Sequence, residues 1–198
     1  MPLTSPEVLS QQTSVGTARV HFCGQGAGLV VLGHGAGGGI DAPDLLAVRE
    51  AALDRGWRVA LVEQPWRVSG HRVAPAPPRL DAAWTEVLST LTGGPLVVGG
   101  RSAGARVACR TAAVVGADAV LCLAFPLQPR GGRPSRAAEL AGVDVPLLVV
   151  QGERDAFGIP PGAVVIPGAD HGFAVRRGTL LAGPVVQVAV GAWLSGLS

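Results

Sequence analysis

The sequence contains no lysine, and all sixteen of its basic residues are arginines, against fourteen acidic residues. This absence excludes three kinds of chemistry, because a Walker A phosphate loop, a pyridoxal Schiff base and a lysine nucleophile each need a lysine side chain. The arginines are spread along the chain and the formal net charge is only +2. We therefore expect no nucleic-acid partner.

Cysteine is also scarce, with three residues far apart in the sequence: Cys23, Cys109 and Cys122. An odd number of cysteines without CxxC spacing is typical of reduced core residues. We therefore expect neither a disulfide framework nor a metal site.

Long hydrophobic runs are missing, although hydrophobic residues make up 48% of the chain and charged residues 15%. The apolar runs at 29–32, 119–125 and 147–150 have the length of strands and are too short to span a membrane. Residues 1–16 are polar and lack the pattern of a secretory signal. We expect a cytoplasmic protein without membrane contact, in which residues 1–16 form a loose or edge-packed lead-in.

The pattern of the remaining chain predicts one α/β domain over residues 1–198. Strand-sized apolar segments alternate with helical patterns, which indicates a three-layer α/β/α sandwich with a mostly parallel sheet of about seven strands. Asp41 is expected to cap the first helix, and the proline-rich segments 64–78 and 125–136 are expected to be irregular loops. The expected strands are 18–23, 28–32, 58–62, 96–98, 119–124, 147–151 and 163–166, and the expected helices are 41–53, 81–91, 103–115, 137–141 and 185–197.

The chain is organised around the segment PLVVGGRSAGAR at 95–106, where an apolar strand leads into a helical pattern. Its Gly100-x-Ser102-x-Gly104 spacing is that of a nucleophile elbow, a sharp turn that holds a serine hydroxyl clear of the sheet. Small residues on both sides are needed because a Cβ there would collide with neighbouring strands. A glycine-rich turn with an incidental serine is the alternative.

Two further polar residues follow later strands. Asp155 comes after the strand expected at 147–151, and His171 comes after the strand expected at 163–166. Parallel strands end at one edge of the sheet, so Ser102, Asp155 and His171 are expected to meet there, in the chain order of an α/β-hydrolase triad. Glu153 is a weaker candidate for the acid, and Asp118, Asp144 and Asp170 fit less well.

The glycine-rich segment GHGAGGG at 33–39 follows another buried strand. Glycines let the backbone approach a reacting centre, and acyl transfer needs N–H groups aimed at the developing oxyanion, each contributing about 3 kcal/mol. We expect these donors to be the N–H groups of Ala36 and Ala103, with the His34 side chain bracing the loop. The same glycines also satisfy GxGxxG, with Glu63 where a ribose-binding acid would lie, so a dinucleotide-binding domain is an alternative.

Other residues near these strand ends are candidates for lining the substrate site. His34, Gly35, Trp66 and Phe125 all lie in segments that follow expected strands. Arg101, beside the serine, could pair with an acidic substrate group or brace the loop. Ordinary packing is the alternative for the aromatic residues.

The chain resembles the α/β-hydrolase superfamily across nearly its whole length. The segments that carry the resemblance are GHGAGGG at 33–39, GGRSAG at 99–104, VVQGERDAFG at 149–158 and GADHGF at 168–173. More narrowly, the chain looks like the small dienelactone-hydrolase-like bacterial proteins, a group similar to the hydrolase-like domain of a eukaryotic chromatin-complex subunit. The resemblance implies a Ser102-His171-Asp155 triad and no cofactor. The nucleophile is serine here, not the cysteine of true dienelactone hydrolases.

These observations predict a serine hydrolase that cleaves a carboxylic ester or thioester of a small molecule through an acyl-enzyme, acting as a monomer or homodimer. No long helical segment separates the strands at 119–124 and 147–151, so a cap domain is not expected and the site should be open. A binding or scaffold protein that keeps the fold without turnover is the alternative.

Overall fold

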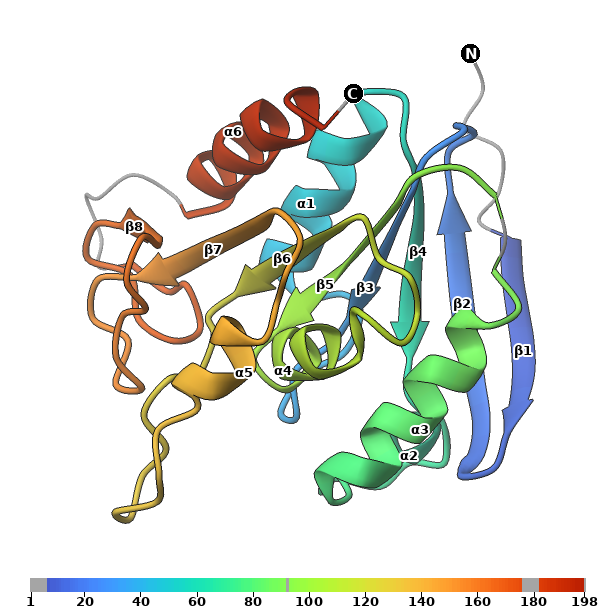
Figure 1. Cartoon of the computed structure of the whole chain (residues 1–198), viewed down its shortest axis with the longest axis horizontal. Coiled ribbons are helices and arrows are strands. Elements are labelled where there is room, and N and C mark those ends of the chain that lie inside the picture. The colour runs from blue at the N-terminus through green and yellow to red at the C-terminus, as the bar shows by residue number, and fades with distance from the viewer. Residues whose placement is uncertain (1–6, 92, 176–181, 198) are drawn as a thin grey trace.

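In the computed structural model, which describes residues 7–91, 93–175 and 182–197, the chain is built on one eight-stranded sheet (Figure 1). The strand order is β1-β2-β4-β3-β5-β6-β7-β8. Strands β3 to β8 run parallel, whereas β2 is antiparallel to both β1 and β4. The strands are β1 (Glu7–Thr13), β2 (Gly16–Cys23), β3 (Leu29–Gly33), β4 (Arg58–Glu63), β5 (Leu96–Arg101), β6 (Ala119–Leu123), β7 (Leu147–Gly152) and β8 (Val164–Ile166).

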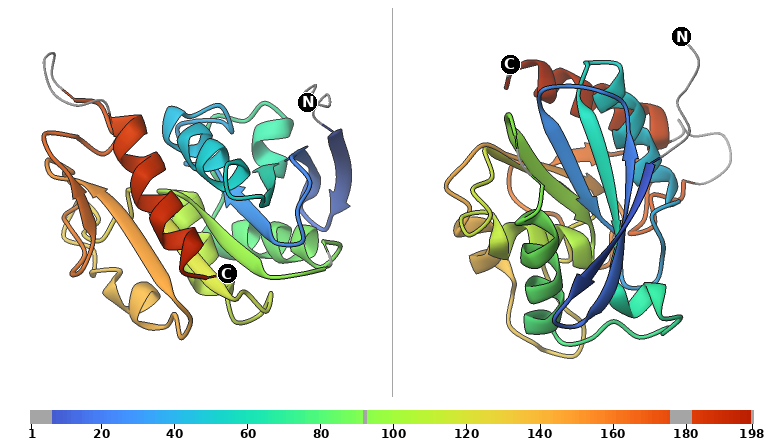
Figure 2. Two further views of the ribbon diagram at one scale, coloured as in Figure 1. Left: turned by 90° about the horizontal axis from the view of Figure 1, so that it is seen from above. Right: turned by 90° about the vertical axis from the view of Figure 1, so that its right-hand side faces the viewer.

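Helices cover both faces of this sheet, which confirms the expected three layers (Figures 1 and 2). Helices α1 (Pro43–Leu53) and α6 (Ala182–Ser195) pack side by side on one face. The other face carries α3 (Pro77–Leu88) and α4 (Ala103–Thr111), with the short helices α2 (Pro65–Val68) and α5 (Ala137–Ala141) beside them. Within the described ranges, no helix combines the length and apolar character needed to cross a bilayer.

Residues 7–13 of the expected lead-in are edge-packed and not loose, because they form β1, a strand that was not among the seven expected. β1 pairs with β2 along its whole length, from Glu7 opposite Phe22 to Thr13 opposite Gly16. Glu86 of α3 anchors the intervening turn by accepting hydrogen bonds from the N–H and the hydroxyl of Ser14. An edge strand that is mostly exposed needs few apolar residues, so its polar sequence resembles a loop. Residues 1–6 of the expected lead-in lie outside the described residues.

The expected irregular segment 64–78 is also wrong in part, because it contains α2 and the start of α3. Pro65 and Pro77 open these two helices. Proline is well tolerated in the first turn, where its missing N–H would have no helical partner. The expected cap of α1 is wrong as well: α1 begins after Ala42, and no side chain caps it.

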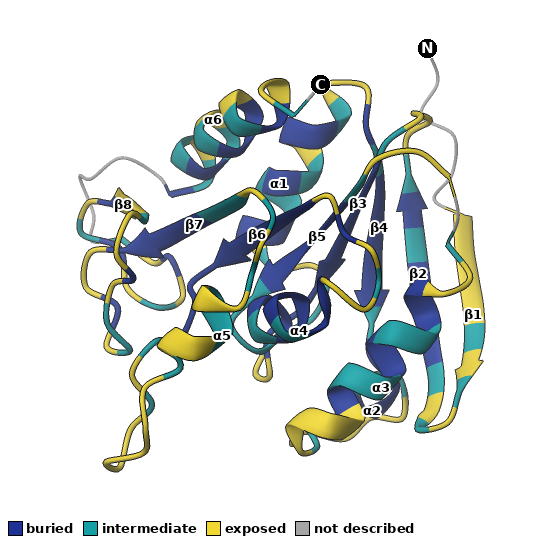
Figure 3. Ribbon diagram, in the orientation of Figure 1, coloured by how far each residue is buried: buried dark blue, intermediate teal, exposed yellow. Residues whose placement is uncertain are grey.

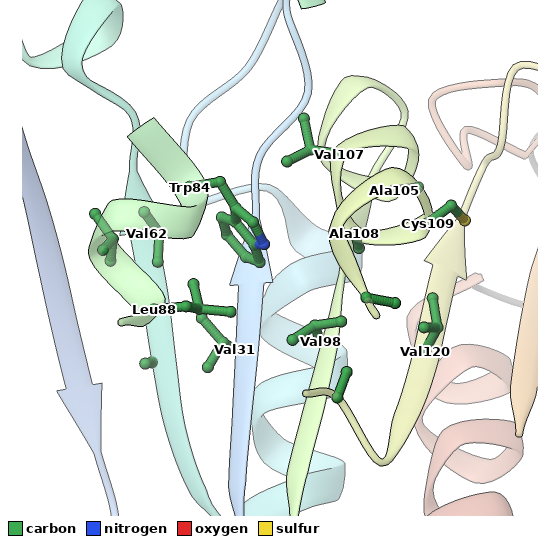
Figure 4. Close-up of a cluster of buried hydrophobic side chains, with 14 of the residues drawn as sticks. Val31, Val62, Trp84, Leu88, Val98, Ala105, Val107, Ala108, Cys109 and Val120 are labelled. Carbon is green, nitrogen blue, oxygen red and sulfur yellow. The ribbon is translucent and has the colours of Figure 1, made fainter. Parts of the chain in front are cut away.

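The apolar core lies on both sides of the central strands, which are buried except at some of their end residues, whereas β1 and many loops are exposed (Figure 3). On the α3–α4 face, Trp84 is 1% exposed and lies over the sheet (Figure 4). The neighbouring side chains in this layer include Val31, Val62, Leu88, Val98, Val107, Ala108 and Val120.

Substitutions of Trp84 test the packing of this layer. The Trp84 indole is buried, and its N–H has no hydrogen-bond partner in the part of the chain that the structure describes. We expect Trp84→Ala to lower the free energy of unfolding by about 3–5 kcal/mol through the cavity it leaves. Trp84→Phe fills most of that space and removes the unpartnered N–H, so its loss should be about 1.5 kcal/mol or less. Urea denaturation measures both, with Val114→Ala at an exposed position as the control. Equal losses for the Phe and Ala variants would contradict this packing.

Candidate active site

The turn between β5 and α4 holds Ser102 in a backbone conformation that is rare for a residue with a side chain, with φ 51° and ψ −105°. Its N–H donates to the carbonyl of Leu123 in β6, with N and O 2.9 Å apart. A Cβ on Gly100 or on Gly104 would lie 2.3 Å from the carbonyl oxygen of Gly33 in β3. The glycine–serine–glycine spacing therefore reflects the close approach of β3 to the turn, which supports the elbow interpretation.

Three side chains from distant segments form a hydrogen-bonded line at the edge where the parallel strands end. His171 Nδ1 lies 2.8 Å from Asp155 Oδ2, and His171 Nε2 lies 3.0 Å from Ser102 Oγ. Asp155 follows β7 and His171 follows β8. The Asp155 side chain is fully buried, while that of His171 is 26% exposed, so the line runs from the interior to the surface.

The buried carboxylate of Asp155 has two further donors. Oδ2 accepts from Gln151 Nε2 at 2.7 Å, and Oδ1 accepts from the N–H of Phe157 at 2.8 Å. Such hydrogen bonds hold the carboxylate in one orientation. Gln151 is fully buried and also donates to the carbonyls of Phe125 and Gly158. The role of Gln151 was not predicted, although an amide at the end of an apolar strand was a signal.

A tight turn positions His171. The Asp170 carboxylate accepts from the N–H groups of Gly172 and Ala174, at 2.8 Å and 3.0 Å. The ring of Phe157 contacts the imidazole edge-on, with ring centroids 4.6 Å apart. Phe157, which lies two residues after Asp155, was also not among the predicted site residues.

The competing carboxylates are engaged elsewhere. Glu153 accepts from the N–H of Gly168 at 2.7 Å, and Asp170 is occupied by its own turn. Asp118 accepts from the N–H of Leu96, at the start of β5, and thus lies at the opposite edge of the sheet. Asp155 is the carboxylate that contacts the imidazole.

The glycine-rich loop after β3 lies against the serine, since a Cβ on Gly35 would be 3.5 Å from the Cβ of Ser102. Among the described residues, no hydrogen-bond acceptor engages the N–H of Ala36 or that of Ala103. Two N–H groups beside the serine are thus available to an external acceptor. His34 is 3% exposed and braces the loop: its Nδ1 lies 2.9 Å from the carbonyl of Gly35, and its Nε2 accepts from the N–H of Gln64 at 3.2 Å.

The residues that were predicted to line the substrate site differ in their burial and in what they contact. Phe125 is 0% exposed, so its expected place at an open substrate mouth is wrong. Trp66 is 8% exposed and lines a cavity of about 220 Å³ between α2 and α3. Arg101 contacts other loops of the protein: its Nε lies 3.1 Å from Asp44 Oδ2, and its Nη2 donates to the carbonyl of His171 at 3.1 Å.

The features of a dinucleotide site are missing from the glycine-rich loop. A dinucleotide fingerprint opens its helix within the motif, whereas α1 begins at Pro43, after residues 33–39 have ended. The Glu63 carboxylate lies 3.7 Å from Arg19 and 3.9 Å from His21, both on β2. The dinucleotide alternative therefore has no support in this loop.

Comparisons with known proteins agree with this fold. Residues 26–179 match a family model described as an alpha/beta hydrolase domain. None of the curated proteins matches the chain. Among solved structures, a serine hydrolase without a lid from Xanthomonas campestris is 20% identical, with a TM-score of 0.75 and 98% of each chain covered. Est1E from Butyrivibrio proteoclasticus is 14% identical, with a TM-score of 0.75, over 96% of this chain and 98% of that one. A dienelactone hydrolase from Anabaena variabilis is 18% identical, with a TM-score of 0.68, over 97% of this chain and 99% of that one.

The buried His34 provides a test through pH. Burial lowers the pKa of its imidazole below the ordinary value of 6.5. In the unfolded chain the ring takes up a proton near that value, so the folded state loses stability as the pH falls below it. We expect the free energy of unfolding to decrease between pH 7.5 and pH 5.5, and to decrease less in His34→Gln, whose amide does not titrate. Denaturant titrations at several pH values measure the two slopes, and identical slopes would contradict a buried neutral His34.

Proposed function

The chain belongs to the alpha/beta hydrolase family, and we propose that it is a serine hydrolase that cleaves a carboxylic ester or thioester of a small molecule through an acyl-enzyme. The observation that carries the proposal is the continuous hydrogen-bonded line from the buried Asp155 carboxylate through His171 to the Ser102 hydroxyl, with distances of 2.8 Å and 3.0 Å. Each of these atoms has the role that acyl transfer requires of it.

In the first half of the reaction, Ser102 Oγ attacks the substrate carbonyl carbon while His171 Nε2 takes the hydroxyl proton. The carbonyl oxygen gains negative charge, which the free N–H groups of Ala36 and Ala103 stabilise by about 3 kcal/mol each. His171 then gives its proton to the departing alcohol or thiol. The acyl group stays on Ser102, and a water molecule activated by His171 releases it as the acid.

Asp155 supports this proton transfer through the histidine tautomer. Its carboxylate accepts from Gln151 and from the N–H of Phe157, so it is held as an acceptor for His171 Nδ1–H. With the proton on Nδ1, the lone pair of Nε2 faces Ser102. The same carboxylate stabilises the imidazolium that forms during the reaction.

The surroundings of the site favour small or flexible acyl groups. α5 is a helix of five residues and is the helical insertion between β6 and β7, so no cap covers the carboxyl edge there. A marked preference for long-chain lipid substrates would contradict this part of the proposal.

A fluorophosphonate probe, which reacts with activated serines, tests the nucleophile. We expect it to label the wild-type protein and not Ser102→Ala, because the probe needs the Ser102 hydroxyl. Equal labelling of the two proteins would refute the assignment. A wild type that is neither labelled nor active on a panel of esters, thioesters and amides would instead favour a binding or scaffold role for the fold.

The role of Asp155 is tested separately, with Glu153 as a matched control. Asp155→Asn keeps the size of the side chain but presents the wrong partner to His171 Nδ1–H, so kcat should fall about 10²- to 10⁴-fold. Glu153→Gln changes an exposed carboxylate two residues away and should leave kcat within about twofold of the wild type. Steady-state kinetics on an ester active with the wild type compares them. If kcat fell more in Glu153→Gln than in Asp155→Asn, Glu153 and not Asp155 would be the acid that orients His171.

A further inference from the structure

Arg101, the residue directly before the serine, joins three segments that meet at the site. Its guanidinium Nη2 donates to the carbonyl of His171 with N and O 3.1 Å apart, and its Nε lies 3.1 Å from Asp44 Oδ2. Its Nη1 faces the glycine-rich loop, since a Cβ on Gly35 or on Gly38 would lie 3.7 Å or 3.8 Å from that nitrogen. One planar group thus contacts the loop of His171 and the first turn of α1, and it lies beside the loop that carries the Ala36 N–H.

The pair that Arg101 makes with Asp44 is buried. Asp44 is 3% exposed, and the Arg101 side chain is 17% exposed. Removing two charges from water offsets much of their attraction, so a buried ion pair adds little net stability compared with apolar side chains of similar size. The contact is an ion pair and not a hydrogen bond, since neither Arg101 Nε nor Asp44 Oδ2 has a hydrogen-bond partner among the described residues. What it does provide is a charge that keeps the planar guanidinium beside the first turn of α1, while Nη2 donates to the carbonyl of His171. The Asp44 carboxylate also balances the Arg101 charge, which disfavours a role for Arg101 as the receptor of an acidic substrate group.

The contact with His171 matters because few bonds connect its turn to the elbow. Among the described residues, the hydrogen bonds between residues 168–175 and the segment 99–104 are the one from Arg101 to the His171 carbonyl and the one between His171 and Ser102 themselves. The second bond must change during the reaction as the proton moves. The Arg101 bond can persist through every step, since neither of its atoms reacts.

We propose that Arg101 is a positioning residue, which keeps the turn of His171 and the glycine-rich loop in register with Ser102 while Asp44 holds its guanidinium in place. This inference rests on the proposed function, because register matters only if the three segments act on one substrate. A displacement of about 1 Å among reacting groups can slow a reaction 10²-fold. Arg101 does not contact the reacting atoms in this arrangement, so its loss should lower kcat and leave KM almost unchanged.

The experiment compares Arg101→Ala with Arg106→Ala. Arg106 is a matched control because it lies five residues further along, on α4, and its side chain is 19% exposed, close to the 17% of Arg101. It pairs with Glu139, which does not belong to the site. Thermal melts show whether each variant folds. We expect Arg101→Ala to lower kcat about 10²-fold with KM within about threefold of the wild type, and Arg106→Ala to change neither constant by more than about twofold.

Chemical rescue separates positioning from a general loss of structure. Added guanidinium at low millimolar concentration should raise kcat of Arg101→Ala at least about tenfold and in a saturable manner, because the ion can enter the space that the side chain leaves. It should not stimulate Ser102→Ala or Arg106→Ala. Arg101→Lys should be intermediate, since an ammonium keeps the charge but lacks the fork that reaches both Asp44 and His171.

The outcomes separate the inference from the proposed function. Absence of Ser102-dependent labelling and turnover in the wild type would remove the proposed function, and this inference with it. An active wild type with kcat of Arg101→Ala within about threefold, or reduced without guanidinium rescue, would overturn the positioning role alone. If Arg101→Ala does not fold, Asp44→Asn replaces it: a larger loss of kcat than in Arg106→Ala supports the role, and an unchanged kcat overturns it.

Discussion

The close approach of β3 to the β5–α4 turn is the constraint on which the site depends. The carbonyl of Gly33 occupies the space that a Cβ would need at Gly100 or at Gly104, so only glycine fits at either position. This contact forces the chain to reverse sharply at Ser102, which adopts a φ of 51°. It also brings the glycine-rich loop after β3 against the serine. The hydroxyl and the free N–H groups thus owe their proximity to one backbone contact.

Around this turn, the buried charges near the reacting groups are held by partners. Asp155 accepts from Gln151, Phe157 and His171, and Asp44 lies against Arg101. Burial raises the pKa of Asp44, and the neighbouring Arg101 acts against that rise. Charges arranged in this way need no reorganisation when a reaction begins, which is the property that makes a preorganised site effective.

Much of the architecture was predictable because it depends on local patterns. Apolar runs of strand length, separated by helical patterns, predicted a parallel sheet covered on both faces, and the α/β-hydrolase resemblance is confirmed by the family match. Predictions failed where tertiary contacts override composition. β1 is polar because it lies at an edge, and its turn is anchored by Glu86 of α3, more than seventy residues away. Pro65 and Pro77, which suggested loops, begin helices.

By itself, the sequence determined which residue types are available and where they fall relative to the strand ends. The reason is that chain order alone sets the glycine spacing around Ser102 and the positions of Asp155 and His171. Only the tertiary structure decided which groups touch. It paired His171 with Asp155 and not with Glu153, buried the side chain of Phe125, and brought Gln151 and Asp44 to their charged partners. The physical reason is that hydrogen bonds act over about 3 Å, a scale on which neighbours are set by packing between distant segments.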